Sequence, residues 1–180
     1  MDLSKYDNSD FDPGAGRVKR LLWYYINAML FDSWVLPHSG VKCFLLRLFG
    51  AKIGNGVVIK PRVNIKYPWN LLVGNNVWLG EGCWIDNLAL IKIGSNVCVS
   101  QDAYLLTGNH DYKDNKFSLI VKEIHLEDGV WIGSKSIVCP GVRVGMNTVL
   151  SVGSVLRNNA ERDSVYQGNF AIRVKGREIK

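Results

Sequence analysis

The sequence contains few of the residues from which metal and redox sites are built. It has three histidines and four cysteines among 180 residues. The cysteines are Cys43, Cys83, Cys98 and Cys139. None of them has a second cysteine or a histidine nearby at the spacing of a metal or redox motif. We therefore expect no metal cofactor and no redox-active dithiol.

The sequence shows no long apolar run, and its first residues do not have the pattern expected of a secretory leader. Acidic residues such as Asp2 and Asp7 occupy the first segment, and no basic stretch leads into an apolar stretch with a small-residue cleavage site. The apolar residues that follow Arg17 are interrupted by Asn27 and Asp32, which does not suit a membrane span. We predict a cytoplasmic protein with reduced thiols.

The size and composition of the chain fit one domain. A length of 180 residues and a mass of 20.2 kDa are enough for a single hydrophobic core. The contents of 47% hydrophobic and 11% aromatic residues are typical of globular proteins. With 18 glycines and five prolines, a collagenous or proline-rich disordered chain is excluded.

The chain is basic, with a formal net charge of +6 and a sequence pI near 9.2. This charge suits an anionic partner, such as a nucleic acid, a phosphorylated cofactor or an acidic membrane surface. Arg157, Arg173 and Lys175 belong to a basic C-terminal part, where a cofactor with several phosphates could dock. On charge alone, a solvated basic tail explains these residues equally well.

An aliphatic residue recurs every six positions over most of the chain, in five groups of three. The fifteen positions are Ile53, Ile59, Ile65, Val73, Leu79, Ile85, Ile93, Val99, Leu105, Leu126, Ile132, Val138, Val144, Leu150 and Leu156. Four residues after most of them the side chain is small or β-branched, as at Val57 and Val63. A period of six suits a short strand plus a turn, forming one side of a three-sided coil. We expect both positions to point inward.

The spacing between the groups predicts a loop that leaves the coils. The interval from Ile93 to Leu126 is too long for one coil, and the excess is a polar stretch near 111–123. Long loops in a compact domain are usually functional or disordered. This one directly follows His110.

Two short helices are predicted before the first coil. Residues at helical spacing are Val18, Leu21, Leu22, Tyr25, Ile26, Met29 and Leu30 in the first, and Val41, Phe44, Leu45, Leu48 and Phe49 in the second. The first helix also carries Arg17, Lys19 and Arg20 ahead of Trp23. These helices either pack against the coils or make peripheral contact with a membrane surface.

The hexapeptide pattern from Ile53 onward resembles the left-handed β-helix acyltransferases. Residues 107–112 are similar to the family segment that carries the catalytic histidine, and residues 128–133 to the coil that follows it. The chain looks most like the sugar O-acetyltransferases, notably the colanic acid biosynthesis acetyltransferase-like group. The resemblance implies a mainly β fold, with a left-handed parallel β-helix over 53–161. A helical extension over 1–52 precedes it, and a segment over 162–180 completes a coenzyme A site.

The resemblance also implies an activity and an assembly. Family members are trimers that bind acetyl-CoA in the groove between two neighbouring β-helices. We therefore expect a homotrimeric, acetyl-CoA-dependent O-acetyltransferase that acts on a sugar hydroxyl in capsular, exo- or lipopolysaccharide biosynthesis. A nucleic-acid partner is not expected.

His110 is the candidate catalytic base. A protonated hydroxyl is a poor nucleophile at neutral pH, and an imidazole suits the task of removing its proton. Without the surrounding repeat, a histidine before a loop would more often be a solvated turn residue. His38 and His125 lie outside the family motif, and we expect both to be structural.

Four further residues are candidates for binding the acceptor sugar. Asp86 and Asn87 lie about one coil before the His110 segment, so stacking could bring them near the acceptor. As ordinary corner residues they are explained equally well. Asp111 and Tyr112 follow the histidine directly and would orient it or bind the sugar.

The resemblance implies a set of donor-binding residues. They are Gly133, Ser134, Val152, Gly153, Arg157 and Lys175. Backbone amides would hold pantetheine, while Arg157 and Lys175 would meet phosphate. Phe170 lies in a stretch that departs from the family pattern by lacking a proline, and it is a candidate wall of the same channel.

Other functions are possible on the same scaffold, because a fold does not fix the chemistry. An N-acyltransferase that acts on an amino sugar and a non-catalytic structural β-helix protein both stay open. A nucleotidyltransferase would need an N-terminal nucleotide-binding domain. A γ-class carbonic anhydrase would need three zinc-ligating histidines, and His38 lies outside the coils.

Overall fold

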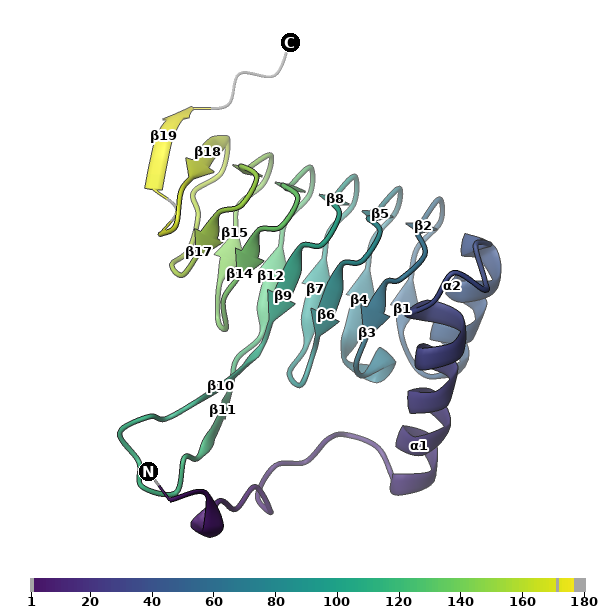
Figure 1. The fold of residues 1–180 in the computed structure, drawn as a ribbon. Helices are drawn as coiled ribbons and strands as arrows, with labels where there is room; N and C mark the ends of the chain where they lie inside the picture. Colours follow the sequence, from purple (N-terminus) through teal and green to yellow (C-terminus); the bar gives the residue numbers. More distant parts are fainter. Residues whose placement is uncertain (1, 171, 177–180) are drawn as a thin grey trace.

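The computed structural model describes residues 2–170 and 172–176. They form a parallel β-helix with two short helices packed at its first coil and an extended N-terminal arm (Figure 1). The helical elements are η1 (Leu3–Lys5), α1 (Arg17–Ile26), η2 (Asn27–Phe31), α2 (Ser39–Leu48) and η3 (Pro68–Asn70). The predicted β-helix with short N-terminal helices is therefore confirmed.

Three parallel sheets make the three sides of the coils, and strands one coil apart are neighbours in each sheet. Sheet A contains β1 (Lys52–Ile53), β4 (Leu71–Val73), β7 (Ile91–Ile93), β12 (Ile124–Leu126) and β15 (Arg143–Val144). Sheet B contains β2 (Val58–Ile59), β5 (Trp78–Leu79), β8 (Cys98–Val99), β13 (Trp131–Ile132), β16 (Val149–Leu150) and β18 (Ser164–Gln167), and β19 (Ile172–Gly176) pairs antiparallel with β18. Sheet C contains β3 (Asn64–Ile65), β6 (Trp84–Asp86), β9 (Tyr104–Leu106), β14 (Ile137–Val138) and β17 (Val155–Leu156).

The six-residue register places the repeated aliphatic side chains inside the prism. Val73 pairs with Ile93, Ile93 pairs with Leu126, and Leu126 pairs with Val144, so equivalent positions stack from coil to coil. All of the fifteen predicted positions are buried except Ile53, which is partly buried in the first coil. Removing this apolar surface from water is the main favourable contribution to the stability of the fold.

At the corners of the coils, several residues have a positive φ, a backbone conformation that is energetically unfavourable for most residue types. Along one corner, Asn76, Asn96 and Asn147 have φ values of 55°, 58° and 56°. Asparagine is among the few residues that tolerate this left-handed region. At Gly94 the coils approach so closely that an added Cβ would lie 2.8 Å from the backbone nitrogen of Asp128. The asparagines and glycines of the repeat therefore set the tight corners.

The two helices are present, but they bury other residues than the predicted stripes. In α1 and η2 the buried side chains are Trp23 and Phe31, and the indole nitrogen of Trp23 donates to the carbonyl oxygen of Ile65 at 2.8 Å. In α2 the buried side chains are Lys42, Cys43 and Leu46. Most of the predicted stripe is exposed, namely Val18, Leu21, Leu22, Tyr25, Met29, Val41, Phe44 and Leu48. One large indole anchors α1 to the coils, while only Ile26, Leu30, Leu45 and Phe49 of the two stripes pack partly against the core.

None of the helices in the described ranges is long and apolar enough to cross a membrane.

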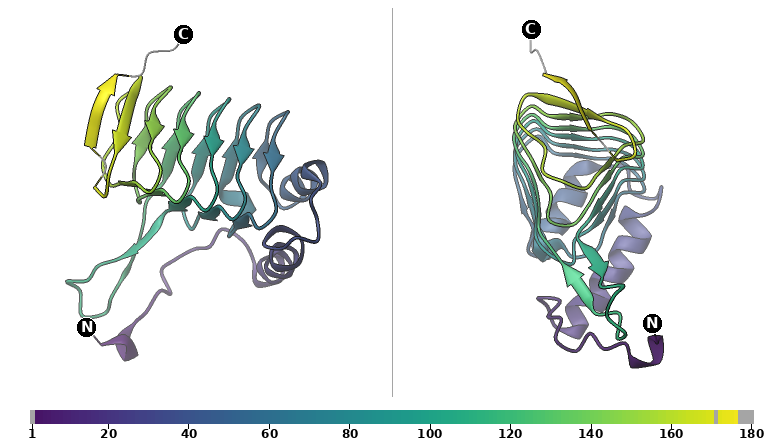
Figure 2. Two further views of the ribbon diagram at one scale, coloured as in Figure 1. Left: turned by 45° about the horizontal axis from the view of Figure 1, so that its top comes forward. Right: turned by 90° about the vertical axis from the view of Figure 1, so that its left-hand side faces the viewer.

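The insertion that leaves the coils is an antiparallel hairpin, and it begins before the predicted loop. Its strands are β10 (Gly108–His110) and β11 (Leu119–Val121), with His110 paired to Leu119. Figure 2 shows the hairpin projecting from one corner of the prism toward the N-terminal arm. His110 is therefore carried by the insertion itself and not by the coil beside it.

An extended arm over residues 2–16 connects the hairpin with α1. The backbone nitrogen of Asp2 donates to the carbonyl oxygen of Asn115 in the hairpin at 3.1 Å. At the other end, the indole nitrogen of Trp69 donates to the carbonyl oxygen of Pro13 at 2.6 Å. The arm thus bridges the tip of the insertion and the first coils, an arrangement that the repeat pattern did not predict.

Candidate active site

The imidazole of His110 is held by Phe117 on the opposite side of the hairpin. Nδ1 of His110 lies 2.8 Å from the carbonyl oxygen of Phe117. The two rings are stacked, with centroids 4.1 Å apart and planes 3° from parallel. Because a carbonyl oxygen only accepts hydrogen bonds, Nδ1 carries the hydrogen and Nε2 keeps its lone pair. A neutral imidazole in this tautomer can accept a proton at Nε2.

Phe117 adopts a backbone conformation that is unusual for its residue type. Its φ is 54°, in the left-handed region that bulky residues avoid. The turn is held by the backbone nitrogen of Phe117, which donates to the carbonyl oxygen of Asp114 at 3.0 Å, and by a short hydrogen bond from the Ser118 hydroxyl to the Asp114 carboxylate. The turn thereby points the carbonyl group of Phe117 at the imidazole, and residues in such conformations often cluster at functional sites.

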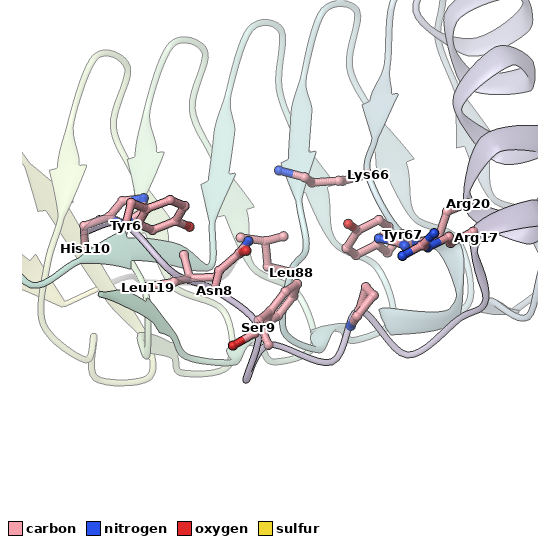
Figure 3. A pocket seen from close by; sticks show the side chains of 12 residues that line it. Tyr6, Asn8, Ser9, Arg17, Arg20, Lys66, Tyr67, Leu88, His110 and Leu119 are labelled. Atoms are coloured by element: carbon pink, nitrogen blue, oxygen red, sulfur yellow. The ribbon is translucent and has the colours of Figure 1, made fainter. Parts of the chain in front are cut away.

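His110 lines a cavity of about 580 Å³ between the arm, α1, the first coils and the hairpin (Figure 3). The lining residues are Tyr6, Asn8, Ser9, Phe11 and Pro13 of the arm, Arg17 and Arg20 of α1, Lys66, Tyr67 and Leu88 of the coils, and His110 and Leu119 of the hairpin. In Figure 3, Tyr6 lies beside His110 at one end, and Arg17, Arg20 and Tyr67 lie at the other. This volume is within the range of small-molecule binding sites.

Asp86 supports the base of the hairpin and one wall of the cavity. Its carboxylate lies 3.1 Å from the ammonium group of Lys66 and accepts a hydrogen bond from the Tyr104 hydroxyl at 3.2 Å. Burial and the nearby Asp86 raise the pKa of Tyr104 above its ordinary value, so its hydroxyl stays a donor. The carbonyl oxygen of Asp86 accepts from the hydroxyl of Thr107, the residue before β10, at 2.7 Å.

The other predicted acceptor residues have different surroundings. The side chain of Asn87 is fully buried, and its amide bonds to the backbone of Tyr67 and Asn70, so it holds the neighbouring corner. Asp111 accepts a hydrogen bond from the backbone nitrogen of Lys113 within the hairpin turn. Tyr112 is 78% exposed and does not line the cavity. Of the four, Asp86 and Asn87 therefore contact residues of the cavity wall, namely Lys66 and Tyr67.

Four predicted donor residues lie together at the corner between sheets B and C. Gly133 and Ser134 follow β13, and Val152 and Gly153 follow β16, with the backbone nitrogen of Gly153 donating to the carbonyl oxygen of Ser134 at 2.9 Å. Val152 is exposed. Packing alone also explains Gly133, because an added Cβ would lie 2.6 Å from the carbonyl oxygen of Leu150.

The remaining two donor residues lie elsewhere in the chain. Arg157 follows β17 at the edge where sheet C gives way to sheet A, and its guanidinium lies over the Phe170 ring at 4.9 Å from the centroid. The two residues help to line a cavity of about 340 Å³. Lys175 is on β19, where it pairs with Val165. One chain therefore does not bring all six predicted donor residues into one site.

The sequence pattern missed the residues that surround His110. Tyr6 and Phe117 lie outside the repeat, and nothing in their spacing indicated that they contact the imidazole. The sequence shows Arg17 and Arg20 as basic residues of the first helix, but it does not indicate that they line the cavity of His110. Their clustering ahead of Trp23 was the only available signal.

The other two histidines lie outside this cavity. His38 precedes α2 and is exposed, while Nε2 of His125 lies 2.9 Å from the carboxylate of Glu123. Within the described part of the chain, no three histidine, cysteine or acidic side chains gather as metal ligands would.

Comparisons with known proteins agree with this architecture. No model of a known protein family matches the chain. It is 35% identical over 177 residues to the protein named "Putative colanic acid biosynthesis acetyltransferase WcaF" of Escherichia coli, which covers 98% of this chain and 97% of that one. It is 27% identical over 128 residues to the galactoside O-acetyltransferase of Escherichia coli, covering 69% and 63% of the two chains.

Among solved structures, the fold is shared with a hexapeptide-repeat-containing acetyltransferase of Vibrio cholerae, determined in complex with acetyl coenzyme A. The TM-score is 0.82 with 21% sequence identity, over 92% of each chain. The long match to the Escherichia coli relative and the shared coil architecture assign the chain: it belongs to the hexapeptide-repeat acyltransferases and is an acetyltransferase.

Proposed function

We propose that the protein transfers an acetyl group from acetyl-CoA to a hydroxyl group of a sugar, with His110 as the general base. The observation that carries the proposal is the hydrogen bond from Nδ1 of His110 to the carbonyl oxygen of Phe117, 2.8 Å long. It leaves the lone pair of Nε2 available for a proton, in a side chain that lines a ligand-sized cavity. The acetyl-CoA bound to the Vibrio cholerae acetyltransferase supports the choice of donor.

In the proposed reaction, Nε2 of His110 takes the proton of the sugar hydroxyl as its oxygen attacks the thioester carbonyl carbon. A carbon–oxygen bond forms, and backbone N–H groups stabilise the oxyanion of the tetrahedral intermediate. The carbon–sulfur bond then breaks, and the imidazolium returns the proton to the sulfur of the leaving coenzyme A. No covalent intermediate on the protein is required, because the acyl group passes directly from thioester to hydroxyl.

We propose that the donor lies between two chains of a homotrimer of about 60 kDa, three times 20.2 kDa. The division of the donor residues within one chain supports this arrangement. Gly133, Ser134, Val152 and Gly153 lie at one corner of the prism, whereas Arg157 lies at another. A groove between neighbouring prisms would unite a corner of one chain with a different edge of the next.

For the acceptor, we propose a sugar of a polysaccharide precursor, which the name of the Escherichia coli relative supports. We expect Asp86 to act on the acceptor through Lys66, its ion-pair partner, which lines the cavity. Asp111 and Tyr112 would contact an acceptor only from the tip of the hairpin. Asn87 would act only by holding the corner beside Tyr67.

We further propose that the protein works in the cytoplasm and makes peripheral contact with anionic membranes. The support is the exposed apolar surface of α1 and α2, which includes Leu22, Tyr25, Met29 and Phe44. Positive charge accompanies it at the start of α1, and the whole chain has a formal net charge of +6. An apolar face flanked by basic residues suits the interface of a membrane with anionic lipids.

The test is an acetyl transfer assay on the full-length protein with a panel of nucleotide sugars and lipid-linked oligosaccharides. Thiol release and product mass are followed for the wild type, His110→Ala and His125→Ala. We expect His110→Ala to lower the rate by about a hundredfold or more, with coenzyme A binding and the trimer retained. His125→Ala, a histidine outside the cavity, should keep full activity.

Full activity of His110→Ala would reject the imidazole as base. A wild-type protein that binds no acetyl-CoA in calorimetry would instead favour a structural role. Acetylation of amino sugars alone would favour N-acyl transfer.

A further inference from the structure

The end of the cavity away from His110 carries unpaired positive charge. Arg17 and Arg20 line this end, Lys66 is a further basic residue of the cavity, and none of the described lining residues is acidic. Lys66 is paired with Asp86, but no ion pair within the described ranges involves Arg17 or Arg20. Nε of Arg20 is buried from solvent and has no hydrogen-bond partner. A buried guanidinium nitrogen without an acceptor is costly, so a ligand that accepts a hydrogen bond from Nε of Arg20 would be stabilised there.

The two arginines lie at the N-terminal end of α1, where the helix dipole disfavours positive charge. Arg17 and Arg20 occupy the first turn of α1, which contains no acidic residue, and the N-cap Gly16 supplies no side-chain hydrogen bond. Positive side chains at this end of a helix are unfavourable, because the helix dipole is positive there. Two guanidinium groups at the positive end of a helix favour the binding of an anion.

A second cavity continues from the same basic residues. It has a volume of about 590 Å³ and shares Arg17, Arg20, Lys66 and Tyr67 with the first one. Its remaining wall is largely apolar and aromatic and includes Leu21, Tyr24, Ile65 and Trp84. The one carboxylate among its described lining residues, Asp32, accepts a hydrogen bond from Asn64. The basic residues therefore lie between a polar cavity at His110 and a more apolar cavity along α1.

We propose that Arg17 and Arg20 bind the phosphate or diphosphate group of the acceptor, which is a glycosyl phosphate or diphosphate. The sugar would lie in the first cavity with a hydroxyl at His110, and the group beyond the phosphate would enter the second. Figure 3 shows the two arginines at the opposite end of the first cavity from His110, so one extended ligand can reach both. This inference rests on the proposed acetyl transfer and names its substrate class.

The first experiment measures binding without chemistry, using inorganic diphosphate as the probe and isothermal titration calorimetry of the full-length protein. Arg20→Gln and Arg17→Gln should each weaken binding about ten- to a hundredfold, as expected for the loss of charge-assisted hydrogen bonds. Lys52→Gln removes one positive charge at an exposed residue outside both cavities and should bind like the wild type. Equal affinity in all four proteins would overturn the proposal.

The same titration repeated with saturating acetyl-CoA separates the acceptor from the donor. Coenzyme A carries phosphates of its own, so the arginines could in principle serve the donor. Diphosphate binding that is unchanged by acetyl-CoA supports an acceptor subsite. Competition between the two ligands, or loss of acetyl-CoA binding in Arg20→Gln, would overturn it.

The second experiment compares acceptors in the acetyl transfer assay. The arms are nucleoside diphosphate sugars, polyprenyl diphosphate sugars in detergent and the corresponding uncharged methyl glycosides. Arg20→Gln should raise KM for the diphosphate acceptors at least tenfold and leave kcat little changed. Acetyl transfer to the nucleoside diphosphate sugars would indicate that a nucleoside occupies the second cavity. Acetyl transfer to the polyprenyl diphosphate sugars would indicate that a lipid chain occupies it. Wild-type transfer that is fastest to the methyl glycosides would overturn the proposal.

The two proposals fail in different ways. If His110→Ala stays fully active while the arginine variants lose diphosphate binding, the assigned base is wrong and the anion subsite stands. If His110→Ala is inactive while the arginine variants behave like Lys52→Gln in both experiments, the anion subsite is wrong and the acetyl transfer stands.

Discussion

The carbonyl oxygen of Phe117 lies 2.8 Å from Nδ1 of His110, and the ring of the same residue stacks on the imidazole at 4.1 Å between centroids. One residue thereby sets both the tautomer and the plane of the candidate base. The hairpin makes this possible, because pairing of His110 with Leu119 brings the turn back over the histidine. The orientation of His110 thus depends on the insertion.

Replacing Phe117 by glycine should separate the two contributions of that residue. Glycine accepts a φ of 54° without strain and keeps the carbonyl group, so only the stacked ring is lost. We expect kcat to fall about two- to tenfold, the value of an aromatic pair, with KM for acetyl-CoA unchanged. Phe117→Tyr retains an aromatic ring and should have a kcat close to that of the wild type. A glycine variant with the wild-type kcat would show that the ring does not position the imidazole.

The sequence was sufficient to predict the coils because one physical constraint repeats in them. Each side of each coil needs an aliphatic side chain that points inward, as Ile132 does. This requirement produces the six-residue period in the sequence. The corners also leave a pattern in the sequence, because asparagine and glycine recur at the corner positions that have a positive φ.

The surroundings of His110 could not be predicted, because they depend on contacts made once. Tyr6 reaches the imidazole through an arm that has no periodicity, with ring centroids 5.7 Å apart. The packed face of α1 is set by one anchor, Trp23, whose indole hydrogen-bonds to Ile65, and not by the apolar stripe that includes Leu22. Single tertiary contacts of this kind leave no pattern in a sequence.

Ile132→Asp should prevent folding or lower the melting temperature strongly. The side chain of Ile132 on β13 is completely buried inside the prism, where a carboxylate would have no partner. Val35→Asp makes the same kind of substitution at a residue that is 74% exposed and lies outside the coils, and it should melt close to the wild type. Circular dichroism melting of both variants provides the measurement. Equal melting temperatures for Ile132→Asp and the wild type would mean that the inward register is incorrect.

Stability should decrease at alkaline pH because of Cys83. Burial raises the pKa of this thiol from 9.0 to about 12 in the folded protein. Between these values the unfolded chain has lost the proton and the folded chain keeps it, so the free energy of unfolding falls as the pH rises. Lys42 acts in the opposite direction, because burial lowers its pKa. Cys83→Ala should therefore show a smaller loss of stability than the wild type.

The measurement is urea unfolding of both proteins at about pH 8 and about pH 10, on either side of the unfolded thiol's titration. For each protein, the quantity compared is the change in the free energy of unfolding between the two pH values. The absolute free energies are not compared, because Cys83→Ala also leaves a small cavity. Identical changes in the two proteins would show that Cys83 does not titrate differently on folding.

Binding to anionic vesicles should depend on the exposed apolar residues of α1. Leu22 is 55% exposed, does not line either cavity along α1, and would insert among lipid chains if this face meets a membrane. Leu22→Asp should weaken co-sedimentation with phosphatidylserine-containing vesicles about tenfold or more, because burial of one leucine contributes about 1.5–3 kcal/mol. Met146→Asp adds the same charge at an exposed residue after β15, away from α1, and should bind as the wild type does. Equal binding to neutral and anionic vesicles would show that the basic residues do not contribute to membrane binding. Vesicle binding that is unaffected by Leu22→Asp would show that this face of α1 does not contact the membrane.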